Sequence, residues 1–187
     1  MVILLNNVSW MGWNVFLALI PLIFGWLVLI VPQKVLKVAC ALIWFFFLPN
    51  TLYLITDLPH IIWQWHHMHH AGQIALALQY LILVLIGLVT FLLALYPVEK
   101  ALLRSSWLRK KSLVPFFIIT TNFFIGLGIV LGRVMRINSW DIVVDIPKVI
   151  GASLSIFNSL ELMLFVVFFG VFANVYYFVW RKTFKVS

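Results

Sequence analysis

The chain has 187 residues, of which 65% are hydrophobic and only 10% are charged, and its mean hydropathy is +1.13. A soluble domain is charged at about one quarter of its positions, so this composition excludes an aqueous globular fold and predicts one integral membrane domain over residues 1–187. The net charge of +8 comes from short clusters between apolar runs, a pattern typical of membrane insertion and not of nucleic-acid binding.

Five apolar runs are each long enough, at roughly 20 residues, to cross the hydrocarbon core of a bilayer as an α-helix. They predict an all-α bundle of five transmembrane helices, with spans at about 10–31, 35–57, 73–96, 113–131 and 160–180. The first run has no basic segment before it and is too long for a signal peptide, so we expect a retained helix.

The second span contains Pro49, which removes a backbone donor and clashes with the preceding turn. We therefore expect a kink or a local break at this position. A carbonyl freed inside lipid needs a new donor, and the amide of Asn50 is a natural candidate.

The distribution of basic residues predicts how the chain is oriented. Ten of the thirteen Lys and Arg residues fall in the first loop, the third loop and the C-terminal tail, whereas the second loop (58–72) has none. Lys and Arg are enriched in cytoplasmic loops, so the N-terminus is expected outside and the C-terminus inside. The second and fourth loops then lie on the outer side.

A polar stripe is predicted at the outer end of the second span. Asn50, Tyr53 and Asp57 have the spacing i, i+3, i+7, which places them on one helix face if the helix continues past the proline. The stripe predicts either a polar pocket that opens outwards or a set of hydrogen bonds that brace a kinked span. His60 follows Asp57 by three residues, so the pair fits acid–base work or a simple hydrogen bond at a helix end.

A second polar motif follows the fourth span, which itself carries Gly128 and Gly132 at a spacing that permits close helix packing. Arg133 and Arg136 are suited either to ion pairs with outer carboxylates or to an anionic headgroup or phosphate. The motif continues with residues suited to helix capping, interfacial anchoring and charge pairing: Asn138, Ser139, Trp140 and Asp141.

The second loop is rich in histidine, the commonest metal ligand in proteins. Its spacing matches no specific zinc signature, and interfacial loops also use such residues as amphipathic groups. We therefore assign no metal site and keep as weak candidates His66, His67, His69 and His70.

At the two polar motifs, residues 47–60 and 132–141, the chain resembles a bacterial family of polytopic membrane proteins catalogued as domain of unknown function 1361. The resemblance covers most of the chain and supports the fold and the polar site. It implies no reaction. The run from His66 to His70 is unusual for that family, so it is not expected to carry a shared function.

Three classes of function remain open. The first is a binding or accessory subunit of a membrane assembly, in contact with the lipid bilayer and with membrane-protein partners. The second is a membrane enzyme or carrier that acts on an anionic lipid or headgroup. The third is a metal or tetrapyrrole binder that uses outer-side histidines. A transporter is less favoured, because the sequence has no inverted repeat and no paired broken helices. The sequence does not identify a cofactor.

Overall fold

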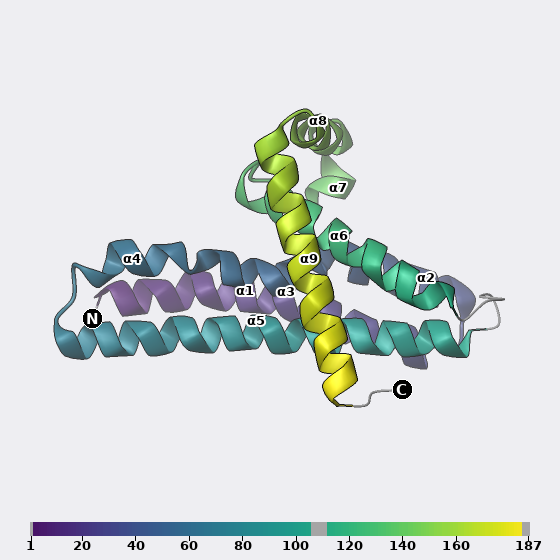
Figure 1. Cartoon of the computed structure of the whole chain (residues 1–187), viewed down its shortest axis with the longest axis horizontal. Helices are drawn as coiled ribbons and strands as arrows, with labels where there is room; N and C mark the ends of the chain where they lie inside the picture. The colour runs from purple at the N-terminus through teal and green to yellow at the C-terminus, as the bar shows by residue number, and fades with distance from the viewer. Residues whose placement is uncertain (1, 106–111, 185–187) are drawn as a thin grey trace. The chain divides into compact units, whose positions relative to one another are not determined.

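A computed structural model describes residues 2–105 and 112–184 of the chain (Figure 1). Within these ranges the secondary structure is helical throughout, with no strand. Four residues that contributed to the charge count lie outside the described residues: Arg109, Lys110, Lys111 and Lys185.

Five helical segments in the described ranges are long and apolar enough to cross a membrane, which confirms the all-α transmembrane fold class. They are α1 (Val2–Ile30), the segment Lys34–Trp65, α5 (His70–Arg104), α6 (Leu113–Arg133) and α9 (Leu160–Thr183). The orientation of the termini remains a prediction.

The segment Lys34–Trp65 is a chain of short helices with nearly continuous helical geometry. It comprises α2 (Lys34–Phe47), α3 (Pro49–Tyr53), the 3₁₀ turn η1 (Leu54–Asp57) and α4 (Pro59–Trp65). Much of the predicted second loop is therefore helical, because α4 extends the span beyond Asp57.

The predicted local break at Pro49 is present as a change in hydrogen bonding, and a side chain supplies the donor for one carbonyl that it leaves free. The backbone N–H of Thr51 donates to the carbonyl oxygen of Leu48 at 3.1 Å, three residues back, and not to that of Phe47. The Asn50 side-chain amide donates to the Phe47 carbonyl oxygen at 3.0 Å. Asn50 therefore takes the role expected of it, which matters because lipid offers no water as a substitute.

Contacts divide the chain into two compact units, Met1–Tyr96 and Pro97–Ser187. In the first unit, α1 packs against α2 and α3. The part of α5 before Pro97 packs against α1 and against the segment Lys34–Trp65. Trp44 is completely buried, and its indole N–H donates to the Ala94 carbonyl oxygen at 2.9 Å. This bond satisfies the one polar group of a large core side chain.

In the second unit, α6 packs along α9, and glycine allows the close contact. A Cβ atom at Gly126 would collide with the backbone carbonyl of Val166 on α9. The sequence pointed instead to Gly128 and Gly132 for close packing. Asn122 of α6 and Asn174 of α9 bond each other directly, from Asn122 Nδ2 to Asn174 Oδ1 at 3.0 Å.

The predicted fourth loop contains two further helices, α7 (Asp141–Val144) and α8 (Ile146–Phe157). Asp145 caps α8 by accepting a hydrogen bond from the Lys148 backbone N–H at 3.2 Å, and Pro147 lies in the first turn. These are standard signals for the start of a helix. In Figure 1, α8 is seen nearly along its axis at one end of α9, so it lies across that end.

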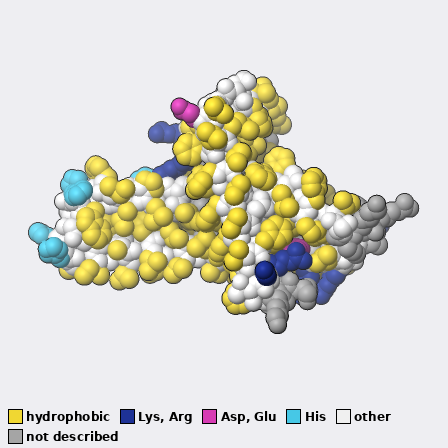
Figure 2. All heavy atoms as spheres, viewed as in Figure 1, with side chains coloured by type: hydrophobic (Ala, Val, Ile, Leu, Met, Phe, Trp, Pro, Cys, Tyr) yellow, Lys and Arg dark blue, Asp and Glu magenta, His cyan; other side chains and the backbone are white. Residues whose placement is uncertain are grey.

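Large apolar side chains cover much of the exposed surface (Figure 2). On α9 they follow one face, at Leu164, Phe168, Val171, Val175 and Val179. A water-soluble protein rarely exposes apolar patches of this extent. The surface is consistent with contact with the hydrocarbon of a bilayer, as expected for a multi-pass membrane protein.

Candidate functional site

The predicted site residues fall in both units, and each set is described by itself. In the first unit, Asp57 ends the turn η1 and is only 2% exposed. A 3₁₀ turn advances roughly 120° per residue, so η1 rotates Asp57 away from the line of Asn50 and Tyr53. Asn14 of α1 meets it there, and Asn14 Nδ2 donates to Asp57 Oδ2 at 3.2 Å.

His60 contacts the backbone of Asp57. Its Nδ1 lies 3.1 Å from the Asp57 carbonyl oxygen. A carbonyl only accepts hydrogen bonds, so Nδ1 is the donor in this contact. Trp10 packs beside the imidazole with ring centroids 5.9 Å apart.

A buried amide network, which the sequence analysis missed, lies in the same unit. Asn7 and Gln64 exchange two hydrogen bonds: Asn7 Nδ2 donates to Gln64 Oε1 at 2.8 Å, and Gln64 Nε2 donates to Asn7 Oδ1 at 3.0 Å. Asn7 Nδ2 also donates to Gln79 Oε1 at 3.1 Å. Asn7 is 1% exposed. The network joins α1, α4 and α5, and we assign it to packing.

In the second unit, α6 ends in a loop whose backbone is strained at Arg136. This residue has φ of 53°, the left-handed region that favours glycine. The reversal lets the backbone N–H of Ile137 donate to the Leu131 carbonyl oxygen at 3.0 Å. Glycine usually occupies such a position after a helix, so arginine is an uncommon residue here.

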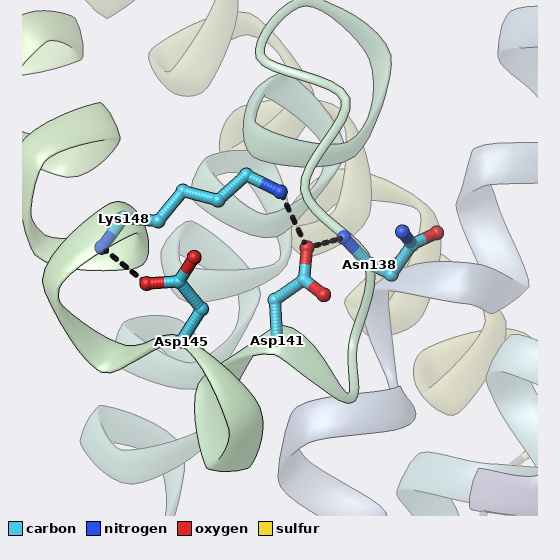
Figure 3. Close-up of polar contacts among 4 residues, drawn as sticks. All are labelled: Asn138, Asp141, Asp145 and Lys148. Atoms are coloured by element: carbon cyan, nitrogen blue, oxygen red, sulfur yellow. Dashed lines mark hydrogen bonds and ion pairs between the residues drawn. The ribbon is translucent and has the colours of Figure 1, made fainter.

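Asp141 forms the polar centre of the segment that follows (Figure 3). Its Oδ2 accepts from the Asn138 backbone N–H at 2.9 Å and from Lys148 Nζ at 3.1 Å. The backbone hydrogen bond from Asn138, followed by the bond from Lys148, lowers the pKa of Asp141 below its ordinary value. Lys148, and neither predicted arginine, is therefore the cation that pairs with Asp141.

The other predicted residues of this segment have different environments. Arg133 is the last residue of α6 and is half-buried, and Arg133 and Ser139 both have polar or electrostatic contacts. Trp140 is 41% exposed, as expected for an interfacial anchor. Arg136 is exposed and makes no hydrogen bond or ion pair with any described residue of its unit.

A charged cluster in the second unit was also missed. Glu99 was expected in the third loop, but it lies within α5 and is 3% exposed. The Tyr177 hydroxyl donates to Glu99 Oε2 at 2.5 Å, and Arg181 Nη1 forms an ion pair with Glu99 Oε1 at 2.9 Å. Oε1 accepts no well-aligned hydrogen bond, so the Arg181 contact acts through charge. We call Glu99, Tyr177 and Arg181 the glutamate cluster.

The histidine run lies at the turn between α4 and α5, where all four side chains are exposed. His67 Nδ1 contacts the Trp63 carbonyl oxygen at 2.9 Å, and the two rings lie 5.1 Å apart. In the part of the chain that the structure describes, no three His, Cys, Asp or Glu side chains are grouped to hold a metal ion.

A comparison with protein-family models gives a match that covers both polar motifs. No curated protein and no solved structure matches the chain. The family model described as protein of unknown function (DUF1361) matches residues 13–176, a range that includes Asp57, Arg136 and Asp141. The match covers most of the chain and confirms the resemblance seen at the two motifs, so the chain belongs to the DUF1361 family of proteins of unknown function.

Proposed function

We propose that the chain is a binding or accessory subunit in a bacterial inner membrane, and that it binds an anionic group at the outer face through Arg136. The proposal is based on the exposure of Arg136, its backbone conformation and the absence of an ion pair with a described residue of its unit. Asp141, the carboxylate nearest to it in sequence, already pairs with Lys148. Arg136 is exposed, has no ion pair within its unit and occupies a backbone conformation that disfavours arginine.

The surroundings of Arg136 favour a ligand at the level of the lipid headgroups. One face of α8 exposes Ile146, Ile150, Leu154 and Phe157, each at 55–58%. Twelve residues span about 18 Å, too short to cross a bilayer. A helix with such a stripe is typical of one that lies in the membrane interface, where phosphate groups are abundant. We therefore infer that the anionic group is a phosphate of a lipid headgroup or of a partner's bound lipid.

Two substitutions at Arg136 distinguish the contribution of the guanidinium group to binding from the effect of the backbone conformation on stability. Arg136→Gln is expected to weaken binding of short-chain phosphatidylglycerol about 10-fold or more, because a hydrogen bond to a charged group contributes about 1.5–3 kcal/mol. Arg136→Gly should weaken binding equally but stabilise the protein by about 1 kcal/mol, because glycine tolerates this backbone conformation. Calorimetric titration and thermal unfolding in neutral detergent measure the two effects.

The matched control is Arg104→Gln, which removes an exposed cation at the predicted inner side. It should bind the lipid as the unchanged protein does. Arg136→Lys should retain part of the affinity, because it keeps the charge and loses the planar fork. Equal binding by the unchanged protein and Arg136→Gln would contradict the proposal.

The proposed ligand position also depends on orientation. His69 and Ser112 are exposed, whereas the single cysteine, Cys40, is buried. In intact cells, an impermeant thiol reagent should label His69→Cys and should label Ser112→Cys only after the membrane is opened. Labelling of Ser112→Cys from outside would reverse the orientation and place Arg136 on the inner side.

A second candidate, a membrane enzyme or carrier acting on an anionic lipid, is favoured by the first unit. The carboxylate of the buried Asp57 lies three residues from the imidazole of His60, whose Nδ1 contacts the Asp57 carbonyl oxygen. Turnover of phosphatidylglycerol by the protein in vesicles, lost in both Asp57→Asn and His60→Gln, would favour this candidate. Binding without turnover would favour the accessory role.

A further inference from the structure

An open groove runs along the surface of α6 and α9, on the side away from the buried face of α9. Its volume is about 510 Å³, within the usual range of small-molecule sites. The α6 side contributes Ile119 and Phe123, and most of the α9 side is aliphatic or aromatic, from Val171 to Val179. The groove ends at Lys182.

The length of the groove matches one leaflet of a bilayer. Val171 and Lys182 are eleven residues apart on α9, which corresponds to about 16 Å along the helix axis. Half of a hydrocarbon core of roughly 30 Å is about 15 Å. A groove of this length, with a cation at one end, fits a single extended acyl chain whose headgroup lies at the membrane surface.

The one polar residue within the apolar part of the groove is already satisfied. Asn174 Oδ1 accepts from Asn122 Nδ2, and Asn174 Nδ2 donates to the Gly170 carbonyl oxygen at 2.8 Å. A buried amide costs little when its hydrogen bonds are made within the protein. Asn174 therefore does not prevent an acyl chain from lying against it.

The two adjacent cations at the end of α9 differ in their partners. Arg181 pairs with Glu99 in the glutamate cluster. Lys182 is exposed and has no hydrogen bond or ion pair with a described residue of the second unit. Its ammonium group is thus available to an anionic headgroup at the end of the groove, and lysines near the ends of membrane helices reach the interface readily.

We propose that this groove binds one acyl chain of an anionic phospholipid, with the headgroup held by Lys182. The lipid comes from the leaflet that surrounds the C-terminal end of α9, the cytoplasmic one in the predicted orientation. This site is independent of Arg136 and goes beyond the proposed function. Its failure would leave the Arg136 proposal unaffected, because the two tests use different residues.

The test uses the full chain in nanodiscs of phosphatidylcholine with or without phosphatidylglycerol, followed by native mass spectrometry of retained lipid. Val175→Trp fills the groove and should abolish retention of both lipids at this site. Lys182→Ala should bind phosphatidylglycerol about fivefold more weakly and phosphatidylcholine unchanged, because one cation near the surface contributes roughly that factor. Lys182→Arg should restore the preference for phosphatidylglycerol.

Val167→Trp is the matched control, because Val167 is exposed on α9 but does not line the groove. It should retain lipid as the unchanged protein does. Where Val175→Trp lowers the yield of folded protein, Val175→Phe provides a smaller filling change with the same expected direction. Unchanged retention in folded groove-filling variants would overturn the proposal. A change of oligomeric state in place of lipid loss would also overturn it, since the occupant would then be a second copy.

Discussion

Replacing Glu99 with alanine is expected to lower the free energy of unfolding by about 3 kcal/mol. Breaking a buried ion pair costs roughly 3–5 kcal/mol, and the 28% exposure of the Arg181 side chain reduces that cost through solvent screening. The Tyr177 hydroxyl, on a completely buried residue, also loses its acceptor. Thermal unfolding in detergent measures the change.

Two further variants identify the cause of that loss. Glu99→Gln keeps an acceptor for Tyr177 and should cost less, roughly 1–2 kcal/mol. In a double-mutant cycle, Glu99→Ala with Arg181→Ala should lose less than the sum of the single changes. Glu161→Gln is the control, because Glu161 is exposed, and its effect should stay within about 0.5 kcal/mol. Strict additivity in the cycle would show that the ion pair does not stabilise the fold.

A methyl group at Gly126 is expected to separate α6 from α9. The new Cβ would overlap the Val166 carbonyl and lie 3.1 Å from the backbone nitrogen of Gly170. Backbone atoms cannot move aside as the end of a flexible side chain can. Gly126→Ala should therefore destabilise the protein by about 2–3 kcal/mol, at the upper end for an overpacked core. Chemical or thermal unfolding in detergent provides the measurement.

The same substitution at Gly151 provides the control. Outside the adjacent residues and the backbone of its own helix, no described atom lies within 4 Å of a Cβ built at Gly151, which is in the middle of α8. Gly151→Ala should stabilise the protein by about 0.5–1 kcal/mol, because alanine loses less backbone entropy than glycine in a helix. A similar loss of stability in both variants would show that close packing at Gly126 is not what the glycine provides.

The transmembrane helices could be predicted because hydropathy is a property of each local window of sequence. The residues at which these helices end were harder to predict from the sequence. The predicted span 73–96 stops before Pro97, where proline normally ends a helix, yet α5 continues to Arg104. In α5 the neighbouring Glu99 is buried against α9 by Tyr177 and Arg181, residues that follow it by about 80 positions. No local pattern contains that information.

Polar contacts could likewise be predicted only where the two partners lie close together in the sequence. Asn50 could be predicted because its acceptor at Phe47 lies three residues away. The capping of α8 by Asp145 also has a local signal, in an aspartate followed by Pro147, although the predicted spans place this segment in a loop. The contacts of Asn7 and Asn14 had no local signal, because their partners Gln64 and Asp57 are 57 and 43 residues away, respectively. The relation of Asp57 to Arg133 and Arg136 remains a prediction.

The amide network of Asn7, Gln64 and Gln79 should hold the first unit together over a wide range of pH and ionic strength. Amides neither gain nor lose protons over the physiological range and carry no net charge, so their hydrogen bonds depend little on acidity or ionic strength. In the predicted orientation this network lies near the compartment whose composition follows the cell's surroundings. The contact between α1, α4 and α5 should therefore persist at low pH and at low or high ionic strength. A contact made by carboxylates and amines would weaken under the same conditions.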